Sequence, residues 1–184
     1  HQRWLEGYQE KMLRPGEVFT AHLITKYGLP LPIWASVELW ELNQLCFLLS
    51  GLKQEDKIAL SRTYGLSNPE LLVSWVRAIK GIRNHAAHHG RIWNRNLTKQ
   101  PRLPVHGEIP ALNFILEDAG AIRQARCACP LLLMAHMISM VDPHSPWLNL
   151  LNSTVADFPT STGMSPTQMG FPDPWAGFGK RNQT

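Results

Sequence analysis

The sequence predicts an all-α fold, and three observations support this prediction. Apolar residues recur at helical spacing between residues 72 and 86. Asn68-Pro69-Glu70 places a capping residue, a proline and an acid where a helix would begin. No alternating apolar and polar pattern is long enough to build a sheet, and no internal repeat is present. The chain is therefore expected to fold as a bundle of helices.

Six segments have the pattern and length of helices, namely residues 1–26, 33–49, 55–64, 69–89, 119–141 and 145–155. The first is charged and amphipathic, and residues 28–32 break the chain after it. The second places Ile33 and Val37 near one face before Ser50-Gly51 ends it. Gly65 stops the third helix.

The fourth helix has the clearest signals, because its cap at Asn68 is followed by an apolar stripe and then by Gly90 as a stop. The stripe consists of Leu72, Trp75, Val76, Ile79, Ile82 and Ala86. A proline-containing loop over residues 98–110 follows. Pro130 predicts a bend in the fifth helix, and Ser145-Pro146 supplies the cap and first position of the sixth.

We expect three parts in the chain: an N-terminal helical segment over residues 1–28, a helical core over 29–157 and an irregular tail over 158–184. The chain does not begin with Met, so the first segment is expected to continue from upstream sequence. No apolar run is long enough to cross a membrane. The three cysteines are an odd, sparse set without CxxC spacing, which predicts buried thiols in the reducing cytoplasm.

Positive charge is concentrated in one segment. Residues 71–107 contain seven basic residues and no acid, whereas the rest of the chain carries 11 basic and 14 acidic residues. Such a segment is typical of a protein that binds a phosphate-bearing partner, although a solvated helix face gives the same pattern. We therefore expect RNA as a partner, with Lys80 among the phosphate contacts.

Within this segment, residues 83–95 read Arg-Asn-His-Ala-Ala-His-His-Gly-Arg-Ile-Trp-Asn-Arg. On an ideal helix Arg83 falls inside the apolar stripe, where a charge is costly unless it is paired or lies at a cleft. This placement indicates either a functional arginine or one that reaches a buried acid or helix carbonyls. His88 lies about 140° further round the helix. The two side chains therefore converge only if the helix bends or if a second copy meets it across a two-fold axis.

These residue types suit RNA cleavage without a metal. The reaction needs a base for the 2′-hydroxyl proton, an acid for the leaving oxygen and a cation near the phosphorane. His88 can act as base or acid, with His89 in reserve, and Arg83 can hold phosphate oxygens. Asn84 can orient an imidazole or the ribose. Arg83, Asn84 and His88 are thus the candidate catalytic residues.

A metal site is the main alternative for the histidines. His85 and His89 have the i, i+4 spacing of zinc-binding HExxH helices. However, Ala86 stands where the general base belongs, and no carboxylate lies between Glu70 and Glu108. We therefore expect no metal and no other cofactor.

The residues after the predicted helix stop are candidates for contacts with RNA. Exposed aromatic and guanidinium groups can stack on unpaired bases, a role that Trp93 and Arg95 fit. Trp93 can equally anchor the turn to the core. The candidate RNA-binding or supporting residues are Lys80, His89, Arg91, Trp93, Asn94 and Arg95.

At these residues the sequence resembles the Abi-like (AbiD/AbiF) abortive-infection family of the HEPN superfamily. HEPN ribonucleases carry an arginine followed after a few residues by a histidine, a pattern that Arg83 and His88 match. The run over residues 91–95 extends the resemblance. Further similar segments are Lys26-Tyr27-Gly28, Pro32-Ile33-Trp34, Leu72–Trp75 and Met169-Gly-Phe-Pro172.

The resemblance implies a HEPN-like helical bundle and a homodimer whose two motifs form one cleft. It also implies a metal-independent endoribonuclease that acts as a toxin in phage defence. Carried over by position, Arg83 and His88 are the catalytic pair and Asn84 is their polar neighbour. The family usually has an apolar or small residue where His85 stands, so this position departs from the pattern.

Two other functions compete with this one. The chain can be a non-catalytic RNA- or protein-binding HEPN module of a toxin–antitoxin or defence complex, because function belongs to the site rather than the fold. It can also be a nucleotide transferase or the regulated half of a toxin–antitoxin pair, with a protein or RNA antitoxin as partner. The intact pair of Arg83 and His88 favours the enzyme.

Overall fold

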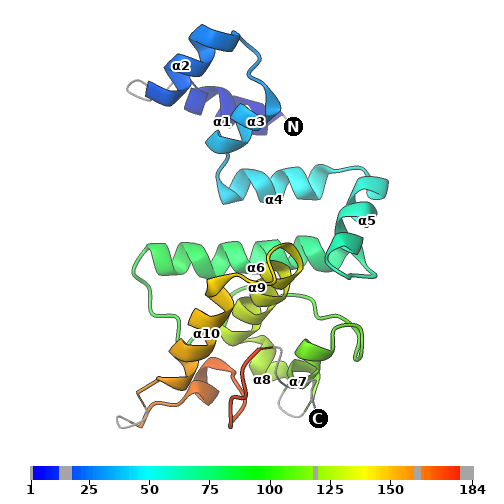
Figure 1. Ribbon diagram of the computed structural model, residues 1–184, viewed down its shortest axis with the longest axis vertical. Coiled ribbons are helices and arrows are strands. Elements are labelled where there is room, and N and C mark those ends of the chain that lie inside the picture. Colours follow the sequence, from blue (N-terminus) through cyan, green and yellow to red (C-terminus); the bar gives the residue numbers. More distant parts are fainter. Residues whose placement is uncertain (1, 13–17, 118–119, 160–162, 179–184) are drawn as a thin grey trace. The chain divides into compact units, whose positions relative to one another are not determined.

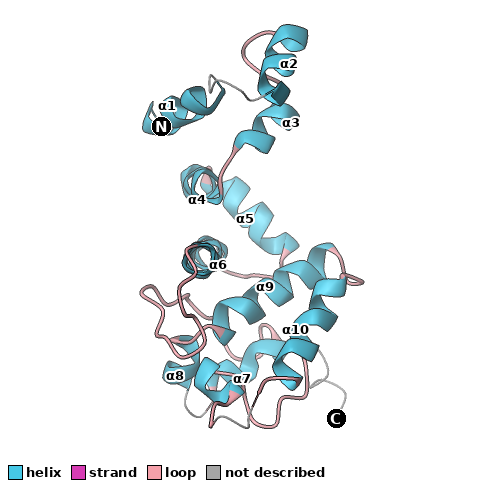
Figure 2. Ribbon diagram, turned by 90° about the vertical axis from the view of Figure 1, so that its left-hand side faces the viewer, coloured by secondary structure: helices cyan, strands magenta, loops and turns pink. Residues whose placement is uncertain are grey.

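A computed structural model describes residues 2–12, 18–117, 120–159 and 163–178 (Figure 1). These residues form helices joined by loops and contain no strand, so the predicted all-α class is confirmed (Figure 2). The contacts divide the chain into two compact units, residues 1–52 and residues 53–184. The predicted division at residues 28 and 157 remains a prediction, since compactness does not test independent folding.

The described residues of the first unit form four α-helices around a small core. The helices are α1 (Gln2–Met12), α2 (Val18–Tyr27), α3 (Ile33–Ser36) and α4 (Leu42–Gly51), with a 3-10 turn η1 (Val37–Leu39) after α3. Met12, Leu23, Leu31 and Ala35 form the buried cluster. The Tyr8 hydroxyl lies 2.7 Å from that of Ser36 and ties α1 to α3.

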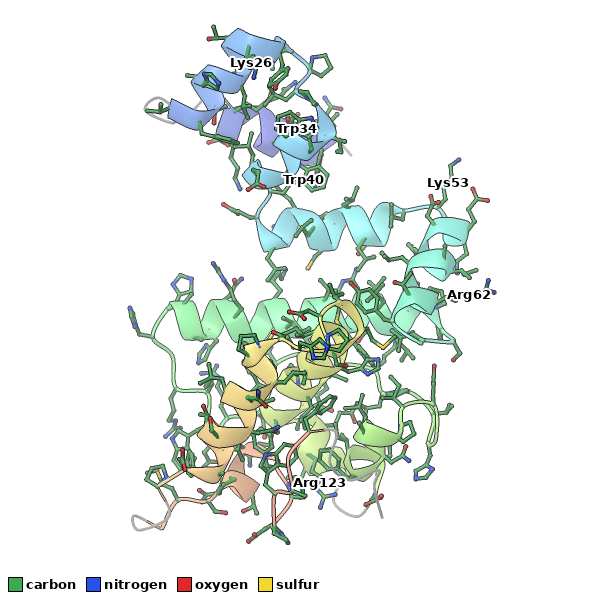
Figure 3. All side chains as sticks on the ribbon, in the orientation of Figure 1. Lys26, Trp34, Trp40, Lys53, Arg62 and Arg123 are labelled. Carbon is green, nitrogen blue, oxygen red and sulfur yellow. The ribbon has the colours of Figure 1, made fainter. Side chains whose placement is uncertain are left out.

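The prediction of one continuous helix over residues 33–49 is wrong. The chain is extended at Trp40 and Glu41, and α4 begins after them. Glu41 and Gln44 form a capping box that starts the new helix. Lys11 pairs with Glu41 at 2.6 Å, while Trp40 meets the Trp4 ring edge-on (Figure 3). Local apolar spacing did not reveal this break because contacts with α1 stabilise it.

The second unit is built around the longest described helix, α6. Its α-helices are α5 (Gln54–Thr63), α6 (Pro69–Ala87), α7 (Asn113–Leu116), α8 (Gly120–Gln124), α9 (Ala128–Val141) and α10 (Pro146–Ala156); 3-10 turns are η2 (Pro110–Leu112) and η3 (Pro166–Met169). Helix α6 packs against α5 and α9. At its centre Trp75 is fully buried and meets His136 edge-on, with ring centroids 5.8 Å apart. The Nε2 atom of His136 lies 2.8 Å from the Tyr64 carbonyl oxygen, to which it donates.

The predicted helix over residues 119–141 is interrupted, but not at Pro130. The break lies between α8 and α9, and Pro130 occupies the first turn of α9. The amide groups of a first turn have no partner within the helix, so a proline costs little there. Ser145 occupies the predicted cap position of α10, yet its side chain makes no capping hydrogen bond.

The tail is more ordered than predicted over residues 163–178. Phe171 is buried, and its ring lies 5.0 Å from that of Trp175, which also contacts Phe114. The backbone amide of Phe178 donates to Asn152 on α10. The composition predicted an irregular segment, but these aromatic side chains pack it onto α7 and the Phe178 amide ties it to α10. Tail residues 160–162 and 179–184 lie outside the described part.

Two smaller predictions concern the thiols and the membrane. All three cysteines are free and buried, as predicted. Burial raises the pKa of the Cys127 thiol to about 11 and that of the Cys129 thiol to about 12. No helix among the described residues is both long and apolar enough to cross a membrane.

Candidate functional site

The basic segment is carried largely by α6, whose start is fixed by its sequence. The Asn68 side chain accepts a hydrogen bond from the Glu70 amide at 2.9 Å, and Pro69 occupies the first helical position. Leu72, Trp75 and Ile82 are buried, so the predicted stripe directs one face of α6 into the core. The same helix then carries residues 83–87 beyond the buried part of that stripe.

Helix α6 ends in a Schellman motif at the histidine cluster. The His89 amide donates to the Ala86 carbonyl and the Gly90 amide to the His85 carbonyl, both at 2.9 Å. His89 takes the left-handed conformation this motif requires, with φ of 54°. Glycine normally occupies that position. The predicted stop at Gly90 is thus one residue late.

Gly90 is needed for a different reason, the close approach of His85. A Cβ atom at Gly90 would lie 2.7 Å from Cδ2 of the His85 ring, and closer still to its Nε2. That Nε2 atom lies 3.2 Å from the Arg91 carbonyl oxygen and 3.3 Å from Nη1 of Arg95. A neutral imidazole nitrogen either donates or accepts, so the two contacts belong to different tautomers. In both, His85 holds the turn after α6.

The prediction that Arg83 is embedded in the apolar stripe is wrong. The Arg83 side chain is exposed, because the buried part of the stripe ends at Ile82 and the predicted member Ala86 is itself exposed. Nη1 of Arg83 donates to the Asn84 side-chain oxygen at 3.2 Å. Among the described residues, Arg83 therefore has neither a buried acid nor a helix carbonyl as its partner.

His88 caps the C-terminal end of α6 with its side chain in solvent. Asn84 and His88 are one turn apart and both exposed, so they share the outer face of the helix. Within the described part of the chain, no hydrogen bond joins Arg83 to His88. The three candidate catalytic side chains of one chain thus lie at the same end of α6, but Arg83 does not contact His88 through a hydrogen bond.

The residues that follow the turn divide into two groups. Trp93 is half-buried against Phe158, with ring centroids 6.4 Å apart, and Asn94 accepts a hydrogen bond of 2.7 Å from Arg126. These contacts favour the anchoring role considered for Trp93. Arg91 and Arg95 are exposed, and neither forms an ion pair with a described residue. Arg126 was not predicted, since it lies 32 positions from Asn94 and no local pattern links them.

The histidines do not form the arrangement of a zinc-binding helix. Helix α6 ends at Ala87, and His89 takes a left-handed conformation, so His85 and His89 do not project from successive turns. Among the described residues, no group of three His, Cys, Asp or Glu side chains is placed to hold a metal ion.

Residues 1–94 match the family model described as "Abi-like protein". The chain belongs to the Abi-like protein family. This membership points to a role in abortive infection, a form of phage defence. The matched region includes all of α6 and the cluster from Arg83 to Asn94, while Arg95 and the tail segment 169–172 lie beyond it. No curated protein and no solved structure matched the chain.

Proposed function

We propose that this Abi-like protein is a metal-independent endoribonuclease of the HEPN type, acting as a toxin-like effector of abortive infection. The observation that carries the proposal is the exposed C-terminal end of α6. Arg83, Asn84 and His88 all present their side chains to solvent there. Within the described ranges these side chains have no buried partner, so a substrate in solvent can reach them.

The surrounding charge supports RNA as the substrate. Residues 71–107 carry seven basic residues without an acid. Arg83, Arg91 and Arg95 are exposed, and within the described ranges no carboxylate pairs with them. Phosphate oxygens would supply the missing negative charge, and each charge-assisted contact would replace counterions on the RNA.

The residue types supply every role in cleavage by transesterification. A base takes the proton of the 2′-hydroxyl, and the 2′-oxygen then attacks the adjacent phosphorus. The bond from phosphorus to the 5′-oxygen breaks, and an acid donates a proton to that oxygen. The products are a 2′,3′-cyclic phosphate and a 5′-hydroxyl. Arg83 stabilises the charge on the phosphorane, Asn84 orients the ribose or an imidazole, and His88 moves the proton.

A homodimer would complete the site. Arg83 and His88 lie about 140° apart around an ideal helix, so one chain does not aim both at a single phosphate. A two-fold axis beside the end of α6 would set Arg83 of one copy near His88 of the other. That His88 would then take the 2′-hydroxyl proton and deliver it to the leaving 5′-oxygen. Any antitoxin that restrains the enzyme, whether protein or RNA, remains a prediction.

Cleavage of a single-stranded RNA in the presence of EDTA tests this proposal. We expect wild-type protein to cut the RNA and leave 2′,3′-cyclic phosphate ends. His88→Ala and Arg83→Ala should each lower the rate at least about a hundredfold. His144→Ala and Arg62→Ala are matched controls, because both residues are exposed and lie outside the basic segment.

Each result has a distinct meaning. Cleavage that depends on added metal would contradict the proposed chemistry, as would equal rates for His88→Ala and His144→Ala. RNA binding without any turnover by the wild-type protein would favour the non-catalytic binding module instead.

A further inference from the structure

A second polar site lies on α6, away from the histidine cluster. A pocket of about 180 Å³ is formed between the middle of α6 and the loop that follows residue 98. Arg77, Lys99 and Arg102 contribute three cations to its lining, and Glu70 contributes one carboxylate. Pockets for whole small molecules are typically larger, at roughly 300–1,000 Å³. The size and charge therefore suit one phosphate group of a polymer.

Hydrogen bonds hold the loop side of this pocket in place. The Arg102 amide donates to the Ser74 hydroxyl at 2.8 Å, and the Arg102 carbonyl accepts from the Trp75 indole at 2.8 Å. Gln124 donates to the carbonyl of Pro101, whose side chain is buried. The cations are thus carried by a backbone that is fixed before any ligand arrives. Preorganisation of this kind lowers the entropic cost of binding.

The pocket and the histidine cluster lie on the same face of α6. An ideal helix turns by 100° per residue, which places four residues within about 60° of one another around the axis of α6. They are Arg77, Gly81, Asn84 and His88. All four are exposed, and apart from the neighbouring residues and backbone of α6 itself, no described atom lies within 4 Å of a Cβ position at Gly81. The face is therefore open between the pocket and His88.

The separation fits a short length of RNA. Arg77 and His88 are about 16 Å apart along the helix axis. A stacked strand advances roughly 3.4 Å for each phosphate, so the interval corresponds to about five nucleotides. One strand could therefore occupy both places at once.

We propose that this pocket binds a backbone phosphate of single-stranded RNA about five nucleotides from the phosphate at His88. The proposal rests on the proposed function, since it takes the RNA at His88 as its second point of contact. Arg77 and Arg102 are the principal ligands, with Lys99 beside them. The Ser74 hydroxyl accepts from Arg102 and can still donate its own hydrogen to the phosphate.

Binding of non-cleavable 2′-O-methyl RNA tests the site independently of catalysis. Oligonucleotides of four and twelve residues would be titrated with the full chain by fluorescence anisotropy at several salt concentrations. For the double variant Arg77→Gln/Arg102→Gln, we expect affinity for the longer RNA to fall at least about tenfold. The slope of log K against log salt should become shallower by about 0.7, the contribution of one single-strand phosphate contact, because the two arginines hold the same phosphate. The loss should grow with RNA length.

Two further double variants distinguish binding at this pocket from a general effect of positive charge on RNA affinity. Lys53→Gln/Arg62→Gln removes the same charge from Lys53, which precedes α5, and from Arg62 in its last turn (Figure 3). Both residues are exposed, so this variant should change affinity less than about twofold. Arg77→Lys/Arg102→Lys keeps the charge and should retain most of the salt slope.

If the two glutamine double variants lost the same affinity for RNA, the pocket assignment would be overturned. It would also be overturned if Arg77→Gln/Arg102→Gln weakened the binding of the short and the long RNA equally. Tighter binding of polyglutamate than of RNA at the pocket would identify an acidic protein as its occupant and overturn it too. Because the RNA carries no 2′-hydroxyl, failure of the proposed ribonuclease would appear only in the cleavage assay.

Discussion

The imidazole ring of His85 lies directly against Gly90, where α6 passes into the following turn. The Arg91 carbonyl and the Arg95 guanidinium meet the same ring nitrogen at 3.2 Å and 3.3 Å. His85 is therefore matched to a glycine five residues later. It holds the turn beside His88.

Gly90→Ala should lower the free energy of unfolding by about 1 kcal/mol, because the new Cβ displaces the His85 ring from its contacts. Chemical denaturation measures this change. The double variant His85→Ala/Gly90→Ala should lose less stability than the two single variants lose in sum, because it has no imidazole ring for the new Cβ to displace. Strict additivity in this cycle would show that the ring does not depend on the glycine.

Asn68→Ala should destabilise the second unit by about 1 kcal/mol, since the Glu70 amide loses its acceptor at the start of α6. Thermal unfolding followed by circular dichroism checks the loss. Asn68→Asp keeps a side-chain oxygen at the cap and should stay close to wild type. A similar loss in both variants would mean that the capping bond is not the cause.

Mixing inactive Arg83→Ala and His88→Ala proteins should restore RNA cleavage to about tenfold above either variant alone. Each mixed dimer would contain one intact arginine and one intact histidine facing each other across the two-fold axis. The rate would be measured after the subunits have exchanged. The double variant Arg83→Ala/His88→Ala, mixed with wild type, controls for exchange. Failure to restore activity would place both residues in a site within one chain.

Glu108 should make the free energy of unfolding depend on pH in the acidic range. Burial acts to raise the pKa of this carboxyl, but hydrogen bonds from Ser67 and Val105 outweigh it and hold the pKa below the ordinary value. The folded state therefore gains stability above the unfolded-state pKa and loses it as the pH falls through the folded value. Glu108→Gln should be less stable than wild type at pH 7. The difference should shrink below about pH 4.

Cys127 and Cys129 should resist alkylation in the folded protein. Burial raises the pKa values of their thiols to about 11 and about 12, so at pH 8 roughly one Cys127 in a thousand is a thiolate. Mass spectrometry after brief iodoacetamide treatment should find both unmodified until denaturant is added. Rapid labelling of the native chain would show that the α8–α9 junction opens readily.

The sequence by itself determined the fold class, the position of α6 and the residues at its exposed end. These features depend on local interactions: helical spacing of apolar residues, the Asn68 cap, and the breaks near Gly28 and Gly65. The family could be inferred for the same reason, because the resemblance rests mainly on a short continuous run, of which residues 83–94 lie inside the matched region.

Only the tertiary structure decided where the helices break and which site residues have partners. The break at Trp40 depends on Trp4 and Lys11, and Asn94 is held by Arg126 from a distant segment. Arg83 is exposed rather than embedded because the buried stripe ends at Ile82, which no helical projection can show. Likewise, the pocket at Arg77 exists only because Trp75 and Ser74 fix a loop that begins more than twenty residues later. Contacts between residues far apart in the chain leave no local pattern, so they become visible only when the chain is folded.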